Sequence, residues 1–180
     1  MISQQLVISG VGGQGILFIA RLLAETAIAK GLPVLTSETH GMAQRGGIVI
    51  SHLKIGEFSS PLVRPGHADG LIALKPGNVG LHRSFLKPGG WIAANAGDSF
   101  PLPEAAEAAT IDADTIAVHL GNPRAVNLVV LGRALAACRL FCSPDDVERE
   151  IRRKLNDKPS LLEGSLAALN AGTGRGFGAD

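Results

Sequence analysis

The sequence predicts an α/β fold with a mostly parallel sheet and a hairpin-like excursion after the second strand. Three observations predict it. A short apolar run at 6–9 leads directly into glycines at 10–15, and the apolar residues that follow have helical spacing. A second apolar run at 33–37 completes a strand–helix–strand unit. Further short apolar runs, each bounded by Gly or Pro, predict more buried strands.

Taken in chain order, the elements follow from apolar spacing and from turn residues. Strands are predicted at 6–9, 33–37, 48–53, 68–74 and 91–95, with a short one near 111. Helices are predicted at 15–30, 76–86, 123–139, 144–155 and 161–169, with a helical turn before 119. The chain from 38 to 47 looks non-helical, so the strands that flank it are expected to pair as a hairpin.

Helix ends and turns carry their own signals. Asn122 and Ser143 are predicted N-caps, because each stands just before a Pro that opens a helix. Asp112 and Asp114 are expected to cap a helix start rather than to act as general acid and base. The Lys-Pro-Gly-Gly segment at 87–90 is predicted to be a turn.

The composition indicates one globular domain, predicted at 1–170, with a flexible tail at 171–180. Of 180 residues, 46% are hydrophobic and 18% charged, which suits a packed core. A formal net charge of +1 argues against nucleic acid or an anionic membrane as partner. The sequence shows no signal-peptide pattern and no apolar run of ~20 residues, and it has two cysteines, so we expect a cytoplasmic location.

The glycine turn at 10–15 matches G-x-G-x-x-G between a strand and a helix, as a phosphate-binding turn requires. Glycines let a ligand approach the backbone, and the helix N-terminus behind them attracts an anion. The alternative is a tight corner that binds nothing. The candidate ligand-binding residues are Gly10, Gly12, Gly13, Gln14 and Gly15.

Two known kinds of nucleotide-binding site can be compared with this turn. A nucleotide triphosphatase needs Lys and then Ser or Thr after the last glycine, and the chain has Ile16 and Leu17 there, which excludes that class. A dinucleotide site needs an acid at the end of the second strand, and Glu38 stands near that position. A free-standing NAD(P)- or flavin-binding oxidoreductase therefore stays open as an alternative.

A second candidate site follows the second strand, where the chain is too polar and glycine-rich for a core. If the loop faces the glycine turn, an arginine there could bind a phosphate or carboxylate. The alternative is a surface loop with solvated charges. The candidate partner- or ligand-contacting residues are Glu38, His40, Gln44, Arg45, Gly46 and Gly47.

Together these two segments resemble a known family. Gly-Val-Gly-Gly-Gln-Gly-Ile-Leu at 10–17, with Gln-Arg-Gly-Gly at 44–47, resembles the gamma-type subunit or domain of 2-oxoacid:ferredoxin oxidoreductases. The fuller stretch 38–47, followed by Ser-His-Leu-Lys-Ile-Gly at 51–56, is most similar to the small beta subunits of indolepyruvate ferredoxin oxidoreductases. The resemblance extends to about Asn170.

The resemblance implies a Rossmann-like three-layer sandwich that works as one subunit of a larger enzyme. It implies a large alpha subunit that holds thiamine diphosphate, Mg²⁺ and [4Fe–4S] clusters, and ferredoxin as a partner of the holoenzyme. The activity implied is the coenzyme A-dependent oxidative decarboxylation of arylpyruvates. Coenzyme A is a candidate ligand at the subunit interface, with the glycine turn as its anion-binding element.

Missing motifs agree with a subunit that does no chemistry alone, so we predict no catalytic residue and no metal ligand in this chain. A thiamine motif is absent. Cys138 and Cys142 are too few for an iron–sulfur cluster and are expected to be small core residues. The five histidines lack zinc-ligand spacing. A non-catalytic scaffold subunit stays open as a further alternative.

Overall fold

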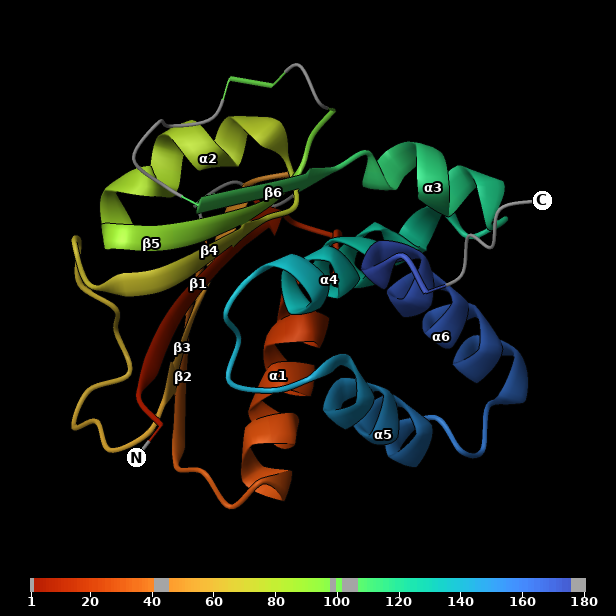
Figure 1. Ribbon diagram of the computed structural model, residues 1–180, viewed down its shortest axis with the longest axis horizontal. Coiled ribbons are helices and arrows are strands. Elements are labelled where there is room, and N and C mark those ends of the chain that lie inside the picture. Colours follow the sequence, from red (N-terminus) through yellow and green to blue (C-terminus); the bar gives the residue numbers. More distant parts are fainter. Residues whose placement is uncertain (1, 41–45, 98–99, 102–106, 176–180) are drawn as a thin grey trace.

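The computed structural model describes residues 2–40, 46–97, 100–101 and 107–175. Within these residues, six strands form one sheet in the order β2-β3-β1-β4-β5-β6, with helices on both faces (Figure 1). The strands are β1 (Gln4–Val11), β2 (Val34–His40), β3 (Ile48–Ile55), β4 (Ala68–Ala73), β5 (Leu86–Asn95) and β6 (Glu107–Ile111). The α/β prediction is confirmed, as is the three-layer arrangement that the resemblance implied.

The helices account for most of the remaining described chain. They are α1 (Ile16–Ala29), α2 (Pro76–His82), α3 (Ala113–His119), α4 (Val126–Ala137), α5 (Pro144–Lys154) and α6 (Pro159–Thr173), with short 3₁₀ turns η1 (Arg83–Phe85) and η2 (Pro123–Ala125). None of the described helices is long and apolar enough to cross a membrane. Because α1 and α4 lie on one face of the sheet and α2 on the other, the sheet is covered on both sides (Figure 1).

The sheet is mixed because one strand runs against the rest. β3 pairs antiparallel with both β2 and β1, whereas β1, β4, β5 and β6 pair in parallel. The predicted hairpin after the second strand is therefore confirmed. The second strand of this hairpin, β3, lies between β2 and β1. The strand–helix–strand unit of β1, α1 and β2 therefore crosses over β3.

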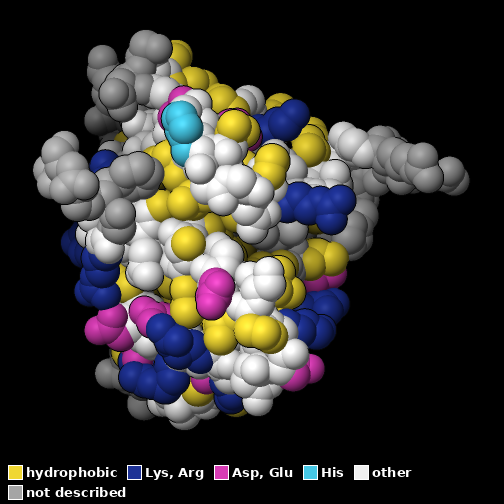
Figure 2. Space-filling view, turned by 90° about the vertical axis from the view of Figure 1, so that its right-hand side faces the viewer, with side chains coloured by type: hydrophobic (Ala, Val, Ile, Leu, Met, Phe, Trp, Pro, Cys, Tyr) yellow, Lys and Arg dark blue, Asp and Glu magenta, His cyan; other side chains and the backbone are white. Residues whose placement is uncertain are grey.

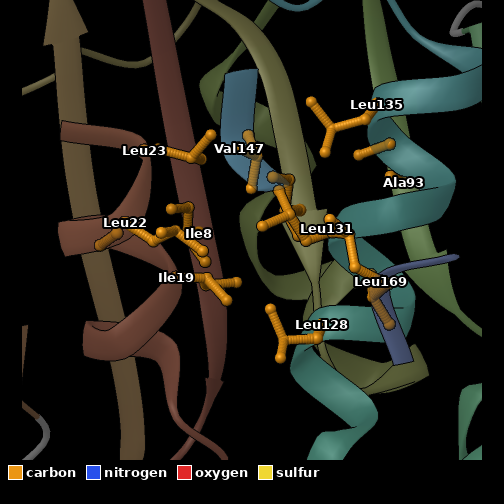
Figure 3. Packing of buried hydrophobic residues seen from close by; sticks show 14 of the residues in the cluster. Ile8, Ile19, Leu22, Leu23, Ala93, Leu128, Leu131, Leu135, Val147 and Leu169 are labelled. Atoms are coloured by element: carbon orange, nitrogen blue, oxygen red, sulfur yellow. The ribbon is translucent and has the colours of Figure 1, made fainter. Parts of the chain in front are cut away.

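Side chains along each strand point alternately to the two faces of the sheet, and each face has its own hydrophobic core. Leu6 and Ile8 of β1 are fully buried on the side of α1 and α4, whereas Val7 is buried on the side of α2. Figure 3 shows Leu22 and Leu23 of α1 and Leu131 of α4 packed around Ile8. The larger core therefore fixes α1, and with it the glycine turn, against the sheet.

Two predicted helix caps, at Ser143 and Asp112, are confirmed, and a glycine ends a third helix. Gly31, with φ +71°, ends α1, and its N–H bonds the Ile28 carbonyl at 2.9 Å. Ser143 forms a capping box with Asp146 at the start of α5. The Asp112 side chain accepts from the N–H of Thr115 at 3.1 Å and caps α3. These hydrogen bonds satisfy backbone groups that a helix end would otherwise leave unpaired.

Four sequence predictions need correction. Asn122 makes no side-chain cap bond, because the chain enters α4 through the 3₁₀ turn η2. The predicted turn at 87–90 lies inside β5 as an irregularity, where the register with β4 shifts and Gly89 has φ +72°. The predicted second strand at 33–37 continues to His40. The last helix, predicted at 161–169, spans Pro159–Thr173 and packs on α4, so residues 171–173 of the predicted tail are helical.

Charged side chains gather on α5. The basic run Arg152-Arg153-Lys154 forms ion pairs with Glu148, Glu150 and Glu25. Figure 2 views the side of α3, α5 and α6 and shows basic and acidic side chains intermingled in its lower part. Mixed charge of this kind favours solubility rather than the binding of a polyanion.

Candidate functional site

The glycine turn joins β1 to α1 with two residues in the left-handed region. Gly13 has φ +94° and Gly15 has φ +76°, conformations that side-chain-bearing residues rarely adopt. Gly15 stands at the N-cap of α1 and has no side chain to bond the first N–H groups of the helix. Those N–H groups and the positive end of the helix dipole can receive an anion.

Gln14 holds the turn in place. Its Oε1 accepts from the Val11 N–H at 2.9 Å, and its Nε2 donates to the Leu74 carbonyl at 3.3 Å. The Gln14 backbone N–H also closes the turn onto the Val11 carbonyl at 3.1 Å. Both polar atoms of the Gln14 side chain therefore form hydrogen bonds with the protein backbone. Contact between Gln14 and a ligand stays a prediction.

The last residues before β3, Gly46 and Gly47, lie beside the glycine turn. The Gly12 N–H donates to the Gly47 carbonyl at 2.9 Å, and Gly46 beside it has φ +74°. His40 is the last residue of β2. Gln44 and Arg45 lie outside the described residues. The structure therefore brings Gly46 and Gly47 to the glycine turn.

Glu38 lies further from the turn than a dinucleotide site requires. In dinucleotide-binding sheets the second strand, which carries the ribose-binding acid, is a neighbour of the first strand. Here β3 separates β2 from β1, and Glu38 pairs in register with Ser51 of β3. The strand order therefore disfavours a standard NAD(P) or flavin site.

The glycine turn stands at a topological switch point. The chain leaves β1 for α1 on one face of the sheet, and it leaves the neighbouring strand β4 for α2 on the other (Figure 1). Ligands of open α/β sheets bind in the crevice that this divergence opens. Lys75 is exposed at the end of β4, directly before α2. Lys75 was not among the predicted site residues, although it stands in a Lys-Pro-Gly turn after a buried strand.

Asn127 contacts the glycine turn, although it was not among the predicted site residues. Its Nδ2 donates to the Gly15 carbonyl at 3.3 Å, and its Oδ1 accepts from the Leu128 N–H at 2.8 Å. A Cβ on Gly15 would lie only 2.2 Å from Asn127 Nδ2, so glycine is required there on two grounds. No sequence signal links two residues that are 112 positions apart.

A surface pocket of about 420 Å³ opens at the turn. Its walls combine glycine backbone with apolar side chains, and they are formed by Gly12, Gly13, Gly15, Ile16, Leu17 and Val49. A pocket with exposed glycine backbone on one side and apolar side chains on the other suits a ligand that has both anionic and apolar parts.

Buried polar residues on the α2 face form a separate cluster. Asn78 Nδ2 donates to Ser9 Oγ at 2.9 Å, and Ser9 Oγ also shares a hydrogen bond with His82 Nδ1 at 2.9 Å. The His52 ring packs edge-on against Phe85, with ring centroids 5.6 Å apart. Burial lowers the pKa of His52 and of His82, so both rings are neutral in the folded protein near pH 7.

Acid is expected to destabilise the fold through this pair. An unfolded chain takes up protons below about pH 6.5, whereas the lowered pKa values keep His52 and His82 neutral to lower pH, so the free energy of unfolding should fall as pH drops below about 6.5. Urea unfolding at pH 7.5 and pH 5.5 measures this loss. In a His52→Gln/His82→Gln variant the loss should shrink, and in the control His119→Gln, at an exposed position, it should not. An unchanged loss in the double variant contradicts this account.

The thiols do not fit an iron–sulfur cluster. Burial raises the pKa of Cys138 and of Cys142 to about 12, so both stay protonated, whereas cluster ligands are thiolates. Cys142 is buried in the larger core and Cys138 packs against it, which confirms the predicted core role. Among the described residues, no three His, Cys, Asp or Glu side chains are grouped to hold a metal ion.

Comparison with known proteins decides the family. Residues 5–174 match the family model described as Pyruvate ferredoxin/flavodoxin oxidoreductase. The chain belongs to this family. Indolepyruvate oxidoreductase subunit IorB of Archaeoglobus fulgidus is 33% identical, over 93% of this chain and 92% of its own length. Its counterpart in Pyrococcus horikoshii is 30% identical over 93% of each chain. Ketoisovalerate oxidoreductase subunit VorA of Methanothermobacter thermautotrophicus is 29% identical over 92% of this chain but only 35% of its own length.

Solved structures of the family share the fold. The gamma subunit of a keto/oxoacid ferredoxin oxidoreductase from Geobacter sulfurreducens superposes with a TM-score of 0.77 at 24% identity, over 98% of this chain and 99% of its own. The 2-oxoglutarate:ferredoxin oxidoreductase from Magnetococcus marinus, solved with coenzyme A bound, gives a TM-score of 0.81 at 22% identity. That match covers 98% of this chain and 31% of the Magnetococcus chain. The resemblance to gamma-type subunits and domains is thereby confirmed.

Proposed function

We propose that this chain is the small (beta) subunit of an indolepyruvate ferredoxin oxidoreductase. It would support the coenzyme A-dependent oxidative decarboxylation of arylpyruvates, with ferredoxin as electron acceptor. The observation that carries the proposal is the near end-to-end match to relatives named indolepyruvate oxidoreductase subunit. The ketoisovalerate relative is matched over only about a third of its length, which disfavours that class.

In this proposal the redox chemistry belongs to a large alpha subunit. Thiamine diphosphate, Mg²⁺ and [4Fe–4S] clusters would be held there, since this chain has no thiamine motif and its two thiols stay protonated. Ferredoxin would meet the assembled enzyme. A cytoplasmic location is part of the proposal, and two free cysteines support it.

Coenzyme A is the ligand that suits the glycine turn under this proposal. When bound, it supplies the thiol that accepts the acyl group. The first N–H groups of α1, behind Gly13 and Gly15, would hold its diphosphate, and the dipole of α1 would stabilise the charge. Gln14 keeps the turn in shape through its bonds to Val11 and Leu74. The exposed ammonium of Lys75 would add positive charge at the same crevice.

The decisive experiment is co-expression with the large subunit of the same oxidoreductase. We expect the two chains to co-purify, and the complex to reduce ferredoxin with an arylpyruvate only when coenzyme A is present. Each chain alone should be inactive, because the proposal places the thiamine site and the coenzyme A site on different chains. Activity of the isolated small chain, or failure of the two chains to assemble, would contradict the proposal.

A charged substitution in the turn tests the site within that complex. Gly12→Asp places a carboxylate where a Cβ has only ordinary contacts, at 3.8 Å from Gly46 N and Gly47 O, so the fold should tolerate it. Repulsion of the diphosphate should raise the KM for coenzyme A by about tenfold or more. Gly80→Asp, in the open on α2, adds the same charge on the other face and should leave that KM unchanged.

A further inference from the structure

A second pocket lies at the edge of the sheet opposite the glycine turn. Its volume is about 380 Å³, which is within the range of small-molecule sites. It opens where parallel strands begin, because Gln4 is the first residue of β1, near the N label in Figure 1, and Asp69 is the second of β4. Half of the lining residues are charged, and the full set is Gln4, Asp69, Lys87, Gly89, Trp91 and Arg139. The function proposed above uses none of them.

Strand β5 bulges at this pocket. Between two matched pairs of the β4–β5 ladder, β4 has one residue, Asp69, and β5 has four, at 87–90. Gly89, with φ +72°, allows the extra residues to turn back into the strand. The bulge places Lys87 beside Asp69, and the two form an ion pair. Bulges often redirect side chains next to binding sites, so this irregularity has a use here.

Trp91 brings an unpaired hydrogen-bond donor to the wall of the pocket. The residue is only 2% exposed, and it packs so closely on β4 that a Cβ on Gly70 would stand 2.2 Å from its ring. Its Nε1 is buried, and no described residue accepts a hydrogen bond from it. An indole N–H can only donate, and it usually has an acceptor when it is buried. The unpaired donor therefore points to a ligand with an acceptor atom.

Arg139 supplies further donors and a positive charge. Its side chain is 79% exposed, and its Nη2 lies 3.4 Å from Oε2 of Glu107, which is itself half exposed. Exposed ion pairs of this kind are weak, so the guanidinium is available to a ligand. The backbone that carries it is fixed, because the Gln4 side chain donates to the Arg139 carbonyl at 2.6 Å and accepts from the Phe141 N–H at 3.0 Å.

The charges of the lining select the kind of ligand. Lys87 and Arg139 are positive and Asp69 is negative, so the lining has a net charge of +1. Both oxygens of Asp69 are engaged, one by Lys87 and the other by the Gln5 N–H at 2.6 Å. A monoanion balances this charge, whereas a phosphate dianion would be repelled by Asp69 and by the nearby Glu107. A planar carboxylate also matches the fork of a guanidinium.

We propose that this pocket binds a small organic monocarboxylate. The carboxylate accepts from the Arg139 guanidinium and from the Trp91 indole N–H, and Lys87, held by Asp69, adds positive charge beside it. The inference goes beyond the proposed function and stands without it, since it concerns groups of this chain at the other edge of the sheet. Phenylacetate is a suitable probe, because it is a monocarboxylate and does not absorb at the wavelengths that excite indole.

Binding can be followed directly, because Trp91 is the only tryptophan of the sequence, which has no tyrosine. The fluorescence of the isolated full chain therefore reports on this pocket. We expect phenylacetate to change the emission of Trp91 in a saturable way, with a Kd of about 1 mM or tighter. Phenylacetamide, which has the same shape without the charge, should not bind. Inorganic phosphate should bind at least about tenfold more weakly than phenylacetate.

Two charge-removing variants should shift the Kd for phenylacetate in opposite directions. Arg139→Gln should raise it by about tenfold, because it removes the charged donors. Glu107→Gln should lower it by about threefold, because it removes the carboxylate that competes for Arg139. Trp91→Phe should raise it by about fivefold, measured by calorimetry because the indole is gone. The matched control is Arg21→Gln, at an exposed position of α1 outside the pocket, which should leave the Kd unchanged.

Several results would overturn the inference. One is the absence of saturation up to about 10 mM phenylacetate. Another is equally tight binding of phenylacetamide or phosphate, because the carboxylate would then not be what the pocket recognises. An unchanged Kd in Arg139→Gln would place any binding elsewhere. If Arg139→Gln lowers the stability of the chain, Glu107→Gln still decides, since a failure to tighten binding contradicts the assigned role of Arg139. None of these results bears on the proposed function, which assembly with the large subunit tests separately.

Discussion

Replacing Gly172 by Ala is expected to lower the free energy of unfolding by about 3 kcal/mol or more. Gly172 lies in α6, and a Cβ there would stand 2.0 Å from the Val129 carbonyl oxygen of α4. The facing residue, Gly132, has the same constraint, because its Cβ would stand 2.2 Å from the Leu169 carbonyl oxygen. Both obstacles are backbone atoms, so the two helices would have to move apart.

The consequences reach beyond this one contact, because α4 packs on the sheet and holds the glycine turn through Asn127. Thermal unfolding should show a fall in Tm of about 10 °C for Gly172→Ala. The Gly132→Ala/Gly172→Ala double variant is expected not to fold, since native stability is only about 5–15 kcal/mol.

Gly164→Ala is the matched control, because it lies in the same helix and its Cβ would meet only Asn122 Nδ2, at 3.4 Å. It should be neutral or should stabilise α6 by up to ~1 kcal/mol, since Ala favours helix more than Gly. Equal stability losses at positions 164 and 172 would show that helix crossing is not what requires Gly172.

Local patterns were enough to predict most of the fold. Apolar runs predicted the strands, and the predicted N-cap Ser143 marks a helix start in the structure. These features depend on residues a few positions apart, which periodicity and capping rules describe well. The contact of Gly47 with the glycine turn agrees with one of the two alternatives left open for its loop, since the carboxyl ends of the strands meet at one edge of the sheet.

Contacts between distant segments could not be predicted in the same way. Asn127 looks like any polar residue near a helix start, yet its amide bonds the Gly15 carbonyl. Gly132 and Gly172 break helix propensity for a reason that only the crossing of α4 and α6 reveals. The turn residues at 87–90 were recognised, but whether they end a strand or bulge within it depends on the pairing of β5 with β4.

Gly15→Ala is expected to cost about 3 kcal/mol of stability and most of the affinity for coenzyme A. The left-handed conformation alone, φ +76°, costs a non-glycine residue about 1–2 kcal/mol. A Cβ 2.2 Å from Asn127 Nδ2 would also displace that amide from the Gly15 carbonyl, at about 1–3 kcal/mol. Urea unfolding measures the first effect, and the KM for coenzyme A of the assembled enzyme measures the second.

Two further variants separate strain from overlap. Gly13→Ala meets no atom within 4 Å but has φ +94°, so its loss of stability reports strain alone and should be smaller than that of Gly15→Ala. Adding Asn127→Ala to Gly15→Ala removes the overlap, so the double variant should be more stable than the sum of the single losses predicts, by about 1 kcal/mol or more. Strict additivity would mean that Asn127 does not confine the turn. A positive coupling would establish that α4 sets the position of the first N–H groups of α1, and that the shape of the proposed anion site depends on a contact far away in sequence.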